Sequence, residues 1–423
     1  MTQNDFAWNN IFEKYHILDK IKEQGEFIIS ANQIKEFREP RLMTKFDHEI
    51  NLPDIFKANN LAILPISRGD YIISRFSAYK TFEAPNFEMQ RISAPDYIQS
   101  LSPQFLFSES IALNYAHASS ILDDFLEDDE LVSTVTGRMS SGNFDYYINT
   151  NAGKKNVSVL NSQIEIDAAY EGINYLSLFE AKRDMSDDFL IRQLYYPYRT
   201  WERKITKPIK TVFLIFSNGV FYLYQYEFTD PKDYNSLQLK KQKNYVISTE
   251  ISLNDIENIL QKTVEVQEPI NIPFPQANSM PRLVNLIEWL SERPMSLQAI
   301  TNKYAFEKRQ SSYYTDAGRY LDLIEKTSNS NKDIIFKLSK QGEHIVKLRY
   351  RERQLAIISK ILEHRVFNEV LKIHLKSGEM PDKNTIVSLI KQSNICKLSD
   401  NTIERRSSTI TGWINWILNI IEK

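Results

Sequence analysis

The sequence has a single cysteine, Cys396, among its 423 residues. One cysteine excludes an intrachain disulfide and a thiolate zinc cluster, and it fits a reducing compartment. The six histidines are scattered and form no doublet suited to a histidine-bound metal. A glycine-rich loop ending in Lys-Ser or Lys-Thr is also missing, which argues against nucleotide hydrolysis. These absences remove several common catalytic chemistries.

Long hydrophobic runs are absent as well. No stretch approaches the roughly 20 apolar residues that a membrane span needs, because the most apolar segment, 413–421, contains Asn415 and Asn419. The first residues show no basic-then-apolar signal. We therefore expect a cytoplasmic protein. With 42% apolar and 25% charged residues, its composition is that of a globular chain of two or three domains.

The formal net charge of -2 conceals an asymmetry along the chain. Residues 281–423 contain 24 Lys and Arg against 16 Asp and Glu, a net of +8, and the remainder carries a net of -10. A proline-containing segment, 264–281, coincides with the change of sign and is interpreted as a linker. The basic C-terminal part indicates a polyanionic partner.

The central part of the chain predicts an α+β or α/β fold with a mixed sheet between helices. A mostly apolar helix over 103–126 precedes the strand-like runs, and a second helix, 186–203, lies among them. The runs are 144–149, 157–167, 175–182, 211–216 and, after an Asn-Gly turn, 220–228. This order favours both antiparallel and parallel strand pairs.

Two of these runs carry charged residues at their ends. One alternates apolar and acidic residues and finishes with Glu165 and Asp167, and the next ends in Glu180, Ala181 and Lys182. Side chains at i and i+2 of a strand share a face, so Glu180 and Lys182 are expected to point the same way. A hairpin return would bring Asp167 beside them.

Carboxylates at strand ends are costly to bury unless they meet a cation or one another. Magnesium prefers carboxylate oxygens, waters and phosphate oxygens, and Asp167, Glu180 and the carbonyl of Ala181 could supply protein ligands. The metal would polarise a phosphodiester and activate water, and Lys182 would orient or deprotonate that water. The alternative is a structural ion pair between Lys182 and one of the carboxylates.

This arrangement resembles the PD-(D/E)xK nuclease superfamily, whose motif is matched by Asp167 and by Glu180-Ala181-Lys182. The resemblance implies metal-ligand roles for Asp167 and Glu180 and a catalytic role for Lys182. Ile166 stands where many members have proline. The pattern is short, and its position on two strands is what makes it informative.

Further residues are candidates for accessory roles. Members of the superfamily often carry Gln and Tyr on the helix after the lysine strand, and Gln193 with Tyr196 is similar to that arrangement. Glu165 could be an extra acid or an exposed ion-pair partner. Glu109, on the upstream helix, lies where some members place another metal-binding acid. Arg138, in a Gly-Arg segment before the strands, could contact the DNA backbone, although a plain turn also explains it.

The basic part predicts helices over 281–292, 296–304 and 310–324, a strand over 334–338 and a further apolar stretch over 344–348. Three helices and a hairpin resemble a winged helix. In that resemblance the third helix enters the major groove of DNA. Its DNA-facing candidates, with Lys332 on the wing, are Lys308, Arg309, Gln310, Ser311, Ser312, Tyr313, Tyr314 and Arg319. Core packing and solvated charges are the alternative.

The last 73 residues predict further helices that end with one over 402–421. Arg405 and Arg406 lie in the polar first half of this helix, before two tryptophans. They could contact phosphate in a second DNA-binding unit. The same region could equally serve in dimerisation.

Together these features resemble type II restriction endonucleases of the PD-(D/E)xK class with a C-terminal winged-helix region. Segments 38–47, 63–66 and 136–145 are similar to parts of such bacterial proteins. The resemblance implies a magnesium-dependent, site-specific double-stranded DNA endonuclease. It also implies a homodimer, since two strands are cut, and a cognate methyltransferase in the same system.

The expected division of the chain is 1–100, an N-terminal α+β region for possible DNA recognition; 101–263, the nuclease domain; and 264–281, a linker. A winged-helix domain, 282–350, and a helical region, 351–423, follow. The alternatives are a modification-dependent or structure-selective nuclease of the same fold, and a non-catalytic winged-helix DNA-binding regulator.

Overall fold

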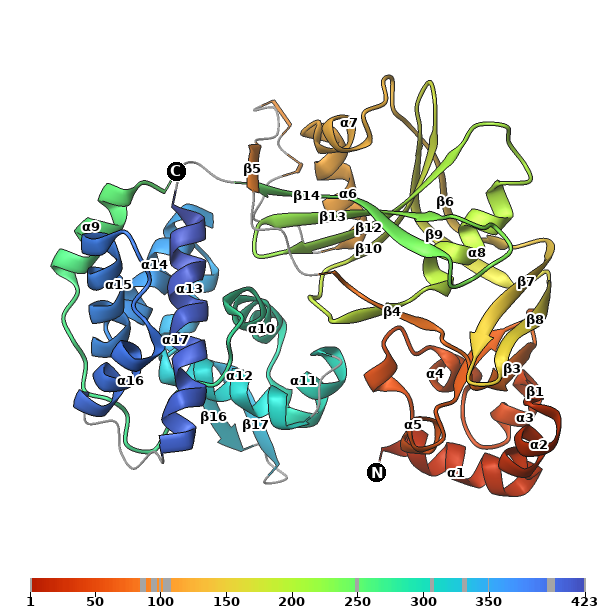
Figure 1. Cartoon of the computed structure of the whole chain (residues 1–423), viewed down its shortest axis with the longest axis horizontal. Coiled ribbons are helices and arrows are strands. Elements are labelled where there is room, and N and C mark those ends of the chain that lie inside the picture. The colour runs from red at the N-terminus through yellow and green to blue at the C-terminus, as the bar shows by residue number, and fades with distance from the viewer. Residues whose placement is uncertain are drawn as a thin grey trace.

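A computed structural model of the chain describes residues 2–83, 89–92, 97–98, 100–101, 108–247, 251–304, 308–328, 333–348, 350–393 and 400–421. Cys396 and Lys332 lie outside these residues. The structure has an N-terminal lobe, a central sheet with its covering helices, and a C-terminal module that is mostly helical (Figure 1). The mixed sheet between helices confirms the coarse fold prediction. Across the described residues, no helix is long and apolar enough to cross a membrane.

The central sheet has seven strands in the order β5-β14-β13-β12-β10-β9-β6. The strands are β5 (Met89–Ile92), β6 (Val132–Ser140), β9 (Gln163–Glu171), β10 (Leu176–Lys182), β12 (Ile209–Ser217), β13 (Val220–Phe228) and β14 (Leu237–Ile247). β10 pairs antiparallel with β9 and parallel with β12, and β12 to β14 form an antiparallel meander. The prediction of both pairing types is therefore confirmed.

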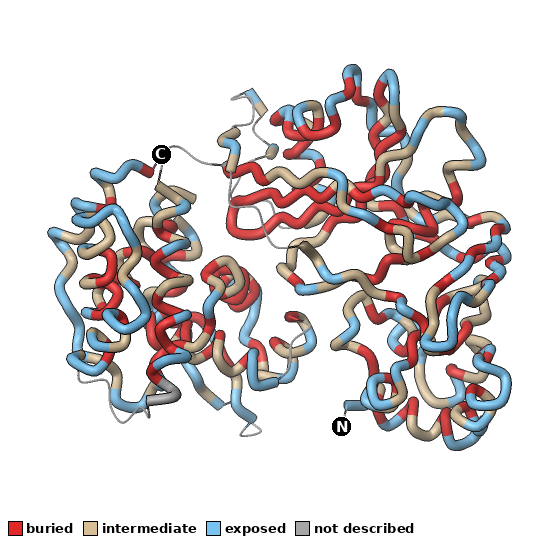
Figure 2. The backbone as a smooth tube through the Cα atoms, in the orientation of Figure 1, coloured by how far each residue is buried: buried red, intermediate tan, exposed pale blue. Residues whose placement is uncertain are grey.

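Each face of the sheet is covered by a separate hydrophobic cluster. Helices α6 (Glu109–Ala118) and α7 (Ile121–Leu126) pack on one face. The other face is covered by α8 (Arg192–Trp201) and by the hairpin of β7 (Asn143–Thr150) and β8 (Gly153–Leu160). The inner strands are buried along most of their length, as Figure 2 shows. Because both faces are covered, these strands read as nearly continuous apolar runs.

The N-terminal lobe combines short helices with a small sheet in the order β1-β3-β2. Its strands are β1 (Glu26–Ser30), β2 (Ala62–Pro65) and β3 (Asp70–Ser74), and β2 and β3 form an antiparallel hairpin. The helices are α1 (Gln3–Tyr15), α2 (Ile17–Gln24), α3 (Ala31–Lys35), α4 (Pro40–Thr44), the 3-10 turn η1 (Glu49–Asn51) and α5 (Asp54–Ala58). The pair of β4 (Tyr79–Thr81) and β11 (Asp188–Leu190) connects this lobe to the centre.

The C-terminal module begins with α10 (Met280–Glu292), β15 (Met295–Ser296), α11 (Leu297–Tyr304), α12 (Lys308–Tyr320), β16 (Ile324–Ser328) and β17 (Ile334–Leu338). Its small sheet has the order β15-β17-β16. Helices α13 (Lys340–Val346), α14 (Tyr350–Leu362), α15 (Arg365–Ser377), α16 (Lys383–Gln392) and α17 (Asp400–Ile420) complete it, with α9 (Leu253–Lys262) packed against α14.

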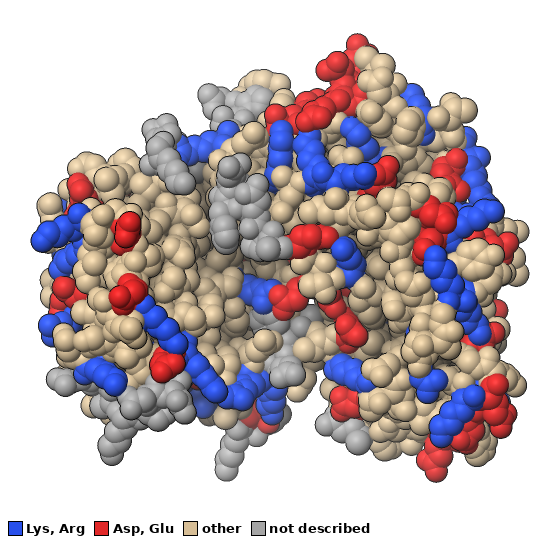
Figure 3. Space-filling view, in the orientation of Figure 1, with Lys and Arg blue, Asp and Glu red and all other residues tan. Residues whose placement is uncertain are grey.

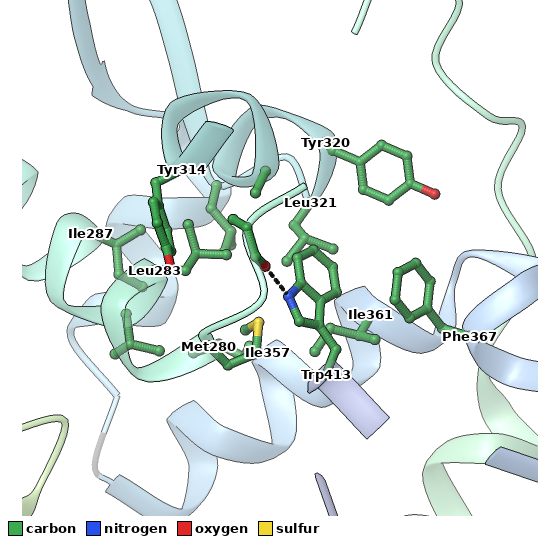
Figure 4. Packing of buried hydrophobic residues seen from close by; sticks show 14 of the residues in the cluster. Met280, Leu283, Ile287, Tyr314, Tyr320, Leu321, Ile357, Ile361, Phe367 and Trp413 are labelled. Atoms are coloured by element: carbon green, nitrogen blue, oxygen red, sulfur yellow. Dashed lines mark hydrogen bonds between the residues drawn. The ribbon is translucent and has the colours of Figure 1, made fainter. Parts of the chain in front are cut away.

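One hydrophobic core joins all parts of this module (Figure 4). Trp413 of α17 is fully buried, stacks on Phe367 of α15 and donates a 2.7 Å hydrogen bond to the carbonyl of Ala277. Ala277 and Phe274 belong to the segment 264–281 and are buried in the same core. This segment, which lacks helix and strand up to Met280, therefore packs against the module.

Several predicted element boundaries were wrong. The helix expected over 103–126 is divided into α6 and α7 by Ser120, whose φ is 58°, and 102–107 lie outside the described residues. The strand expected over 157–167 is two strands separated by a turn at Asn161, with φ 52°. The helix expected over 186–203 spans only α8, because β11 occupies its first part.

Two further corrections concern the basic module. The third helix ends at Tyr320 and not at Ile324, which starts β16. The strand partner of β17 is β16, while the apolar stretch over 344–348 is largely the end of α13. Gly342 of α13 lies so close to the carbonyl of Leu323 that an added Cβ would be 2.1 Å from its oxygen. A short amphipathic helix and a strand have similar apolar content, so periodicity alone could not separate them.

Candidate active site

Asp167 and Glu180 lie opposite each other on the paired strands β9 and β10, at the end away from the connecting turn. The antiparallel register pairs Phe179 with Ala168, and the next position along each strand is Glu180 and Asp167. The pairing of β9 with β6 shifts register at this point, with Asp167 and Ala168 lying opposite Thr136. Such bulges re-aim side chains and are frequent beside active sites. The predicted hairpin return is confirmed.

Hydrogen bonds connect the predicted motif residues. The backbone N–H of Ala181 donates to Asp167 Oδ2 at 2.8 Å. Lys182 Nζ donates to Glu180 Oε1 and, at 3.3 Å, to the carbonyl of Ala181. Gln193 Nε2 of α8 donates to the same Glu180 oxygen at 2.5 Å. The structure thus brings the motif residues together with Gln193.

The two faces of β10 explain this arrangement. Ala181 is fully buried in the cluster under α6 and α7. Glu180 and Lys182 lie on the opposite face with Leu176 and Leu178, which pack toward α8. Only 8% of Glu180 is exposed, so this carboxylate is held close to an ammonium in a poorly solvated place.

The electrostatics reflect this crowding. Burial raises the pKa of Glu180 to about 7; Lys182 opposes the shift, whereas Asp167 adds to it. Burial alone would lower the pKa of Lys182, but the carboxylates of Glu180, Glu109 and Asp167 hold it above its usual range. Lys182 is therefore a charged ammonium, and added positive charge near Glu180 would favour the ionised form of its carboxyl group.

Two additional acids lie near this group. Burial raises the pKa of Glu109, at the start of α6, with Lys182 lowering it and Asp167 raising it. Burial also raises the pKa of Asp184, which is opposed by Lys303 and by the hydrogen bond from Trp289. Asp184 follows Lys182 by two residues, at the exit of β10. The motif residues therefore belong to a larger acidic cluster.

A cavity of about 570 Å³ encloses these groups. The N-terminal lobe, the central sheet and the C-terminal module all contribute to its wall, and a hollow with acidic and basic atoms at its margin is visible between the lobes in Figure 3. The lining side chains are mostly charged: Arg41, Lys45, Asp47, His48, Asn51, Glu109, Arg138, Ile164, Glu165, Asp167, Glu180, Lys182, Asp184, Arg192, Gln193, Pro197 and Lys303. So polar a lining suits an ionic substrate better than an apolar one.

Several of these residues were missed by the sequence analysis. His48 contacts the carbonyl of Asp188 at 2.7 Å and its carboxylate at 3.1 Å through Nδ1. Asp184, Arg192 and Lys303 were also missed. Asp184 and Arg192 flank motif residues and could have been selected by proximity. No local signal marks His48 or Lys303, because they reach the cavity only through tertiary contacts.

Other predicted site residues occupy varied positions. Arg138 on β6 pairs with Glu165 at 3.3 Å at the margin of the cavity, and both side chains are about half exposed. Glu165 is therefore an exposed ion-pair partner, which was the alternative to a role as an extra acid. Tyr196 is fully buried in the core, and its hydroxyl donates to the carbonyl of Pro65 at 2.8 Å. Tyr196 thus has a packing role.

The candidate DNA-facing residues of α12 lie away from this cavity's lining. Arg309 and Gln310 are exposed, Ser312 and Tyr313 are half-buried, and Arg309 Nε donates to the Tyr313 hydroxyl. Arg319 pairs with Asp316 at 2.8 Å within the helix. The opposite face of α12 is buried in the core of the module.

The two arginines of α17 differ in exposure. Arg405 is exposed. Arg406 is only 9% exposed and donates a 2.8 Å hydrogen bond to Gln276, which ties α17 to the segment before α10. Arg406 therefore has a structural contact, whereas Arg405 is accessible to a ligand.

The donor set has the chemistry that magnesium prefers. Asp167 and Glu180 supply carboxylate oxygens, and Ala181 supplies a carbonyl oxygen. Gln193 Oε1 is a buried acceptor for which the described residues provide no donor. In the same described part of the chain, no group of three or more His, Cys, Asp or Glu side chains is placed to hold a metal. Waters and substrate oxygens would have to complete the coordination of an ion here.

Comparisons with known proteins divide the chain into three matched regions. Each matches a family described as a domain of unknown function: DUF6996 over residues 5–73, DUF6997 over 74–246 and DUF7226 over 282–422. No curated protein and no solved structure matches the chain. The cavity is lined by residues from all three matched regions, since Lys45, Glu180 and Lys303 belong to one each.

Proposed function

We propose that this protein is a magnesium-dependent, site-specific double-stranded DNA endonuclease of the PD-(D/E)xK superfamily, acting as a type II restriction enzyme. The observation that carries the proposal is the convergence of Asp167, Glu180 and Lys182 at one strand end, inside a charged cavity. A buried carboxyl group with a pKa near 7 supports a site that gains stability from an added cation. A purely structural ion pair between Lys182 and a carboxylate could lie on the surface and would not require that Glu180 be buried.

The roles of the residues follow from their contacts. Asp167, Glu180 and the carbonyl of Ala181 would hold Mg²⁺, which when bound stabilises negative charge on the phosphate and makes water more acidic. The N–H of Ala181 fixes one oxygen of Asp167, and Gln193 fixes one oxygen of Glu180. Lys182, charged and held between carboxylates, orients the attacking water and neutralises charge that develops on the phosphate.

DNA recognition is assigned to the C-terminal module. Its element order, helix, short strand, two helices and a two-stranded hairpin, supports the proposed likeness to a winged helix. In this proposal the exposed side of α12 enters the major groove, and Arg309 and Gln310 contact base edges or phosphates. The net charge of +8 over 281–423 supports an anionic partner.

Two catalytic sites are the simplest way to cut both strands, so the proposed active form on DNA is a homodimer. A cognate methyltransferase would protect the host DNA in the same system. Both statements follow from the proposed activity and are tested with it.

The experiment compares the wild type with Glu180→Gln and Lys182→Ala on unmethylated phage DNA in Mg²⁺, with sequencing of the fragment ends. Lys154→Ala is the matched control, because Lys154 is an exposed lysine of β8 that lies outside the cavity lining and pairs with Asp233 at 2.6 Å. We expect discrete fragments ending at one short motif from the wild type and the control. Cleavage should be lost in both site variants, while DNA binding in Ca²⁺ persists.

The rival functions give different results in the same assay. Unchanged cleavage by both site variants would refute the assignment of the active site. DNA binding by a wild type that cuts neither unmethylated nor methylated nor branched DNA would indicate a non-catalytic winged-helix regulator. Cutting of methylated or branched DNA alone would indicate a modification-dependent or structure-selective nuclease.

A further inference from the structure

The charges lining the cavity are balanced in number but come from separate parts of the chain. Six carboxylates and six Lys or Arg side chains line it. Arg41 and Lys45 come from the N-terminal lobe, Arg138 and Arg192 from the central domain, and Lys303 from α11 of the C-terminal module. A divalent cation among the carboxylates would make the lining net positive, as an anionic substrate requires.

Lys303 has an unusual environment for a lysine in this module. Its ammonium lies over the ring of Trp289, 4.6 Å from the centroid. Burial lowers its pKa, although Asp184 and Glu292 oppose the shift. No salt bridge found among the described residues involves Lys303, whereas Glu292 pairs with Arg183 at 3.5 Å and Asp184 accepts from Trp289 at 2.7 Å. A partly desolvated ammonium without a close counter-ion is poised to bind an anion that enters the cavity.

The position of Lys303 relative to the motif is fixed by direct contacts. Trp289 Nε1 donates to Asp184 Oδ1 at 2.7 Å, two residues beyond Lys182. Arg282 pairs with Asp187 at 2.5 Å, and Asn285 donates to the carbonyl of Arg183 at 3.3 Å. Helix α10 is therefore bound along the whole turn that leaves β10. Only the two-residue strand β15 separates α11 from α10, so Lys303 is held at the margin of the carboxylate cluster.

We infer that Lys303 binds a backbone phosphate of the DNA strand in the active-site cavity, so that the C-terminal module completes the catalytic site as well as recognising DNA. The inference rests on the proposed nuclease function and assigns a phosphate-binding residue to it. The same ring that supports the Lys303 ammonium anchors the module to Asp184. Trp289 therefore both anchors the C-terminal module to the central domain and supports the proposed phosphate-binding lysine.

The packing of α11 on α12 also constrains the path of the DNA between Lys303 and the residues of α12. Helices α11 and α12 are consecutive and pack on each other. Lys303 and the exposed residues Arg309 and Gln310 therefore lie on two helices that pack on each other. A strand held by Lys303 would be cut close to the base pairs that α12 contacts.

The test uses the full-length protein and three substitutions. Lys303→Met keeps the aliphatic stem over Trp289 and removes the charge, Lys303→Arg keeps the charge, and Lys372→Met removes an exposed lysine of α15 in the same module. DNA affinity is measured in Ca²⁺ over a range of salt concentrations, cleavage is measured in Mg²⁺, and thermal unfolding checks the fold.

We expect Lys303→Met to reduce the slope of log affinity against log salt by about 0.9, the contribution of one phosphate contact. Its cleavage rate should fall about 10- to 100-fold, while Lys303→Arg and Lys372→Met keep the wild-type slope. An unchanged slope and rate for Lys303→Met, with Glu180→Gln inactive, would overturn this inference and leave the proposed function intact.

The remaining outcomes are also decisive. Cleavage by Glu180→Gln at the wild-type rate would refute the proposed active site, and the salt slope would then decide the role of Lys303 alone. A wild type that binds no DNA at low salt would overturn both proposals. A lower melting temperature for Lys303→Met with an unchanged slope would assign the residue to the fold and not to phosphate.

Discussion

Gln193 donates a hydrogen bond of 2.5 Å to Glu180, the carboxyl group that lies between β10 and α8. The contact joins a helix residue to a strand residue thirteen positions away, and Lys182 donates to the same oxygen. Two donors on one oxygen fix the direction of the carboxyl group and leave its other oxygen for another partner. Glu180 is thus held in place by its neighbours before any ligand binds.

Replacing Gln193 should therefore impair cleavage without unfolding the protein. Outer partners of metal-binding carboxylates typically contribute about 10- to 100-fold to metal affinity or activity, and we expect a loss of that size for Gln193→Ala. Cleavage rate and Mg²⁺ half-saturation are the measurements. Gln392→Ala, at the exposed end of α16, is the control. Equal activity of Gln193→Ala and the wild type would show that the contact has no catalytic consequence.

Magnesium binding should depend on pH below neutrality. Burial raises the pKa of Glu180 to about 7, so protons compete with Mg²⁺ for this group as the pH falls below 7. The apparent Mg²⁺ affinity should drop by up to about tenfold per pH unit in that range and level off above it. Calorimetric titration without DNA measures the effect. A constant affinity between pH 5.5 and pH 8 would exclude Glu180 as the competing group.

The turn between β12 and β13 should not tolerate a side chain. Gly219 has φ +71°, and an added Cβ would lie 2.4 Å from Cδ2 of Tyr350 on α14. Gly219→Ala should lower the free energy of unfolding by about 1–3 kcal/mol through strain and overpacking. Gly378→Ala separates the two causes, since Gly378 has φ +79° and no atom within 4 Å of an added Cβ. Urea unfolding is the measurement, and an equal loss in both variants would leave strain as the only cause.

Asp128 should stabilise the fold through its charge. Burial by itself would raise its pKa, but hydrogen bonds from the N–H groups of Asn174 and Tyr175 outweigh it and hold the pKa below the usual range. Asp128→Asn should cost about 1–3 kcal/mol at pH 7, with exposed Asp129→Asn as the control.

The pH dependence of that difference has a defined sign. A lowered carboxyl pKa stabilises the folded state above the unfolded value of about 3.9, and this stabilisation is lost as the pH falls through the folded value. The gap between the wild type and Asp128→Asn should therefore shrink below about pH 4 in urea unfolding. A gap that stays constant down to pH 2.5 would contradict a charge effect.

Much of the central sheet could be predicted from local pattern. β10, β12 and β13 are runs of large apolar residues, and Asn218-Gly219 has positive φ at both positions, as a tight hairpin turn requires. The alternation along β9 and the spacing of β10 also predicted that Asp167 would meet Glu180. These features depend on period and turn chemistry, which neighbouring residues determine.

Other elements lacked such a signal. β6 is an edge strand whose side chains are mostly exposed, so it has no apolar run by which to recognise it. β14 is rich in lysine and glutamine and was missed for the same reason. The break between β8 and β9 was missed because both strands alternate in the same way, and only Asn161 marks the turn.

By itself, then, the sequence determined the strands with strong hydrophobic pattern, the acid-acid-lysine motif at their ends and the basic character of the last third of the chain. The tertiary structure alone decided that His48 and Lys303 line the same cavity as Glu180. These residues lie far apart in sequence, and they meet because β11 binds the segment at His48 and Trp289 binds Asp184. Contacts between separately folded parts depend on surface complementarity, which no local periodicity encodes.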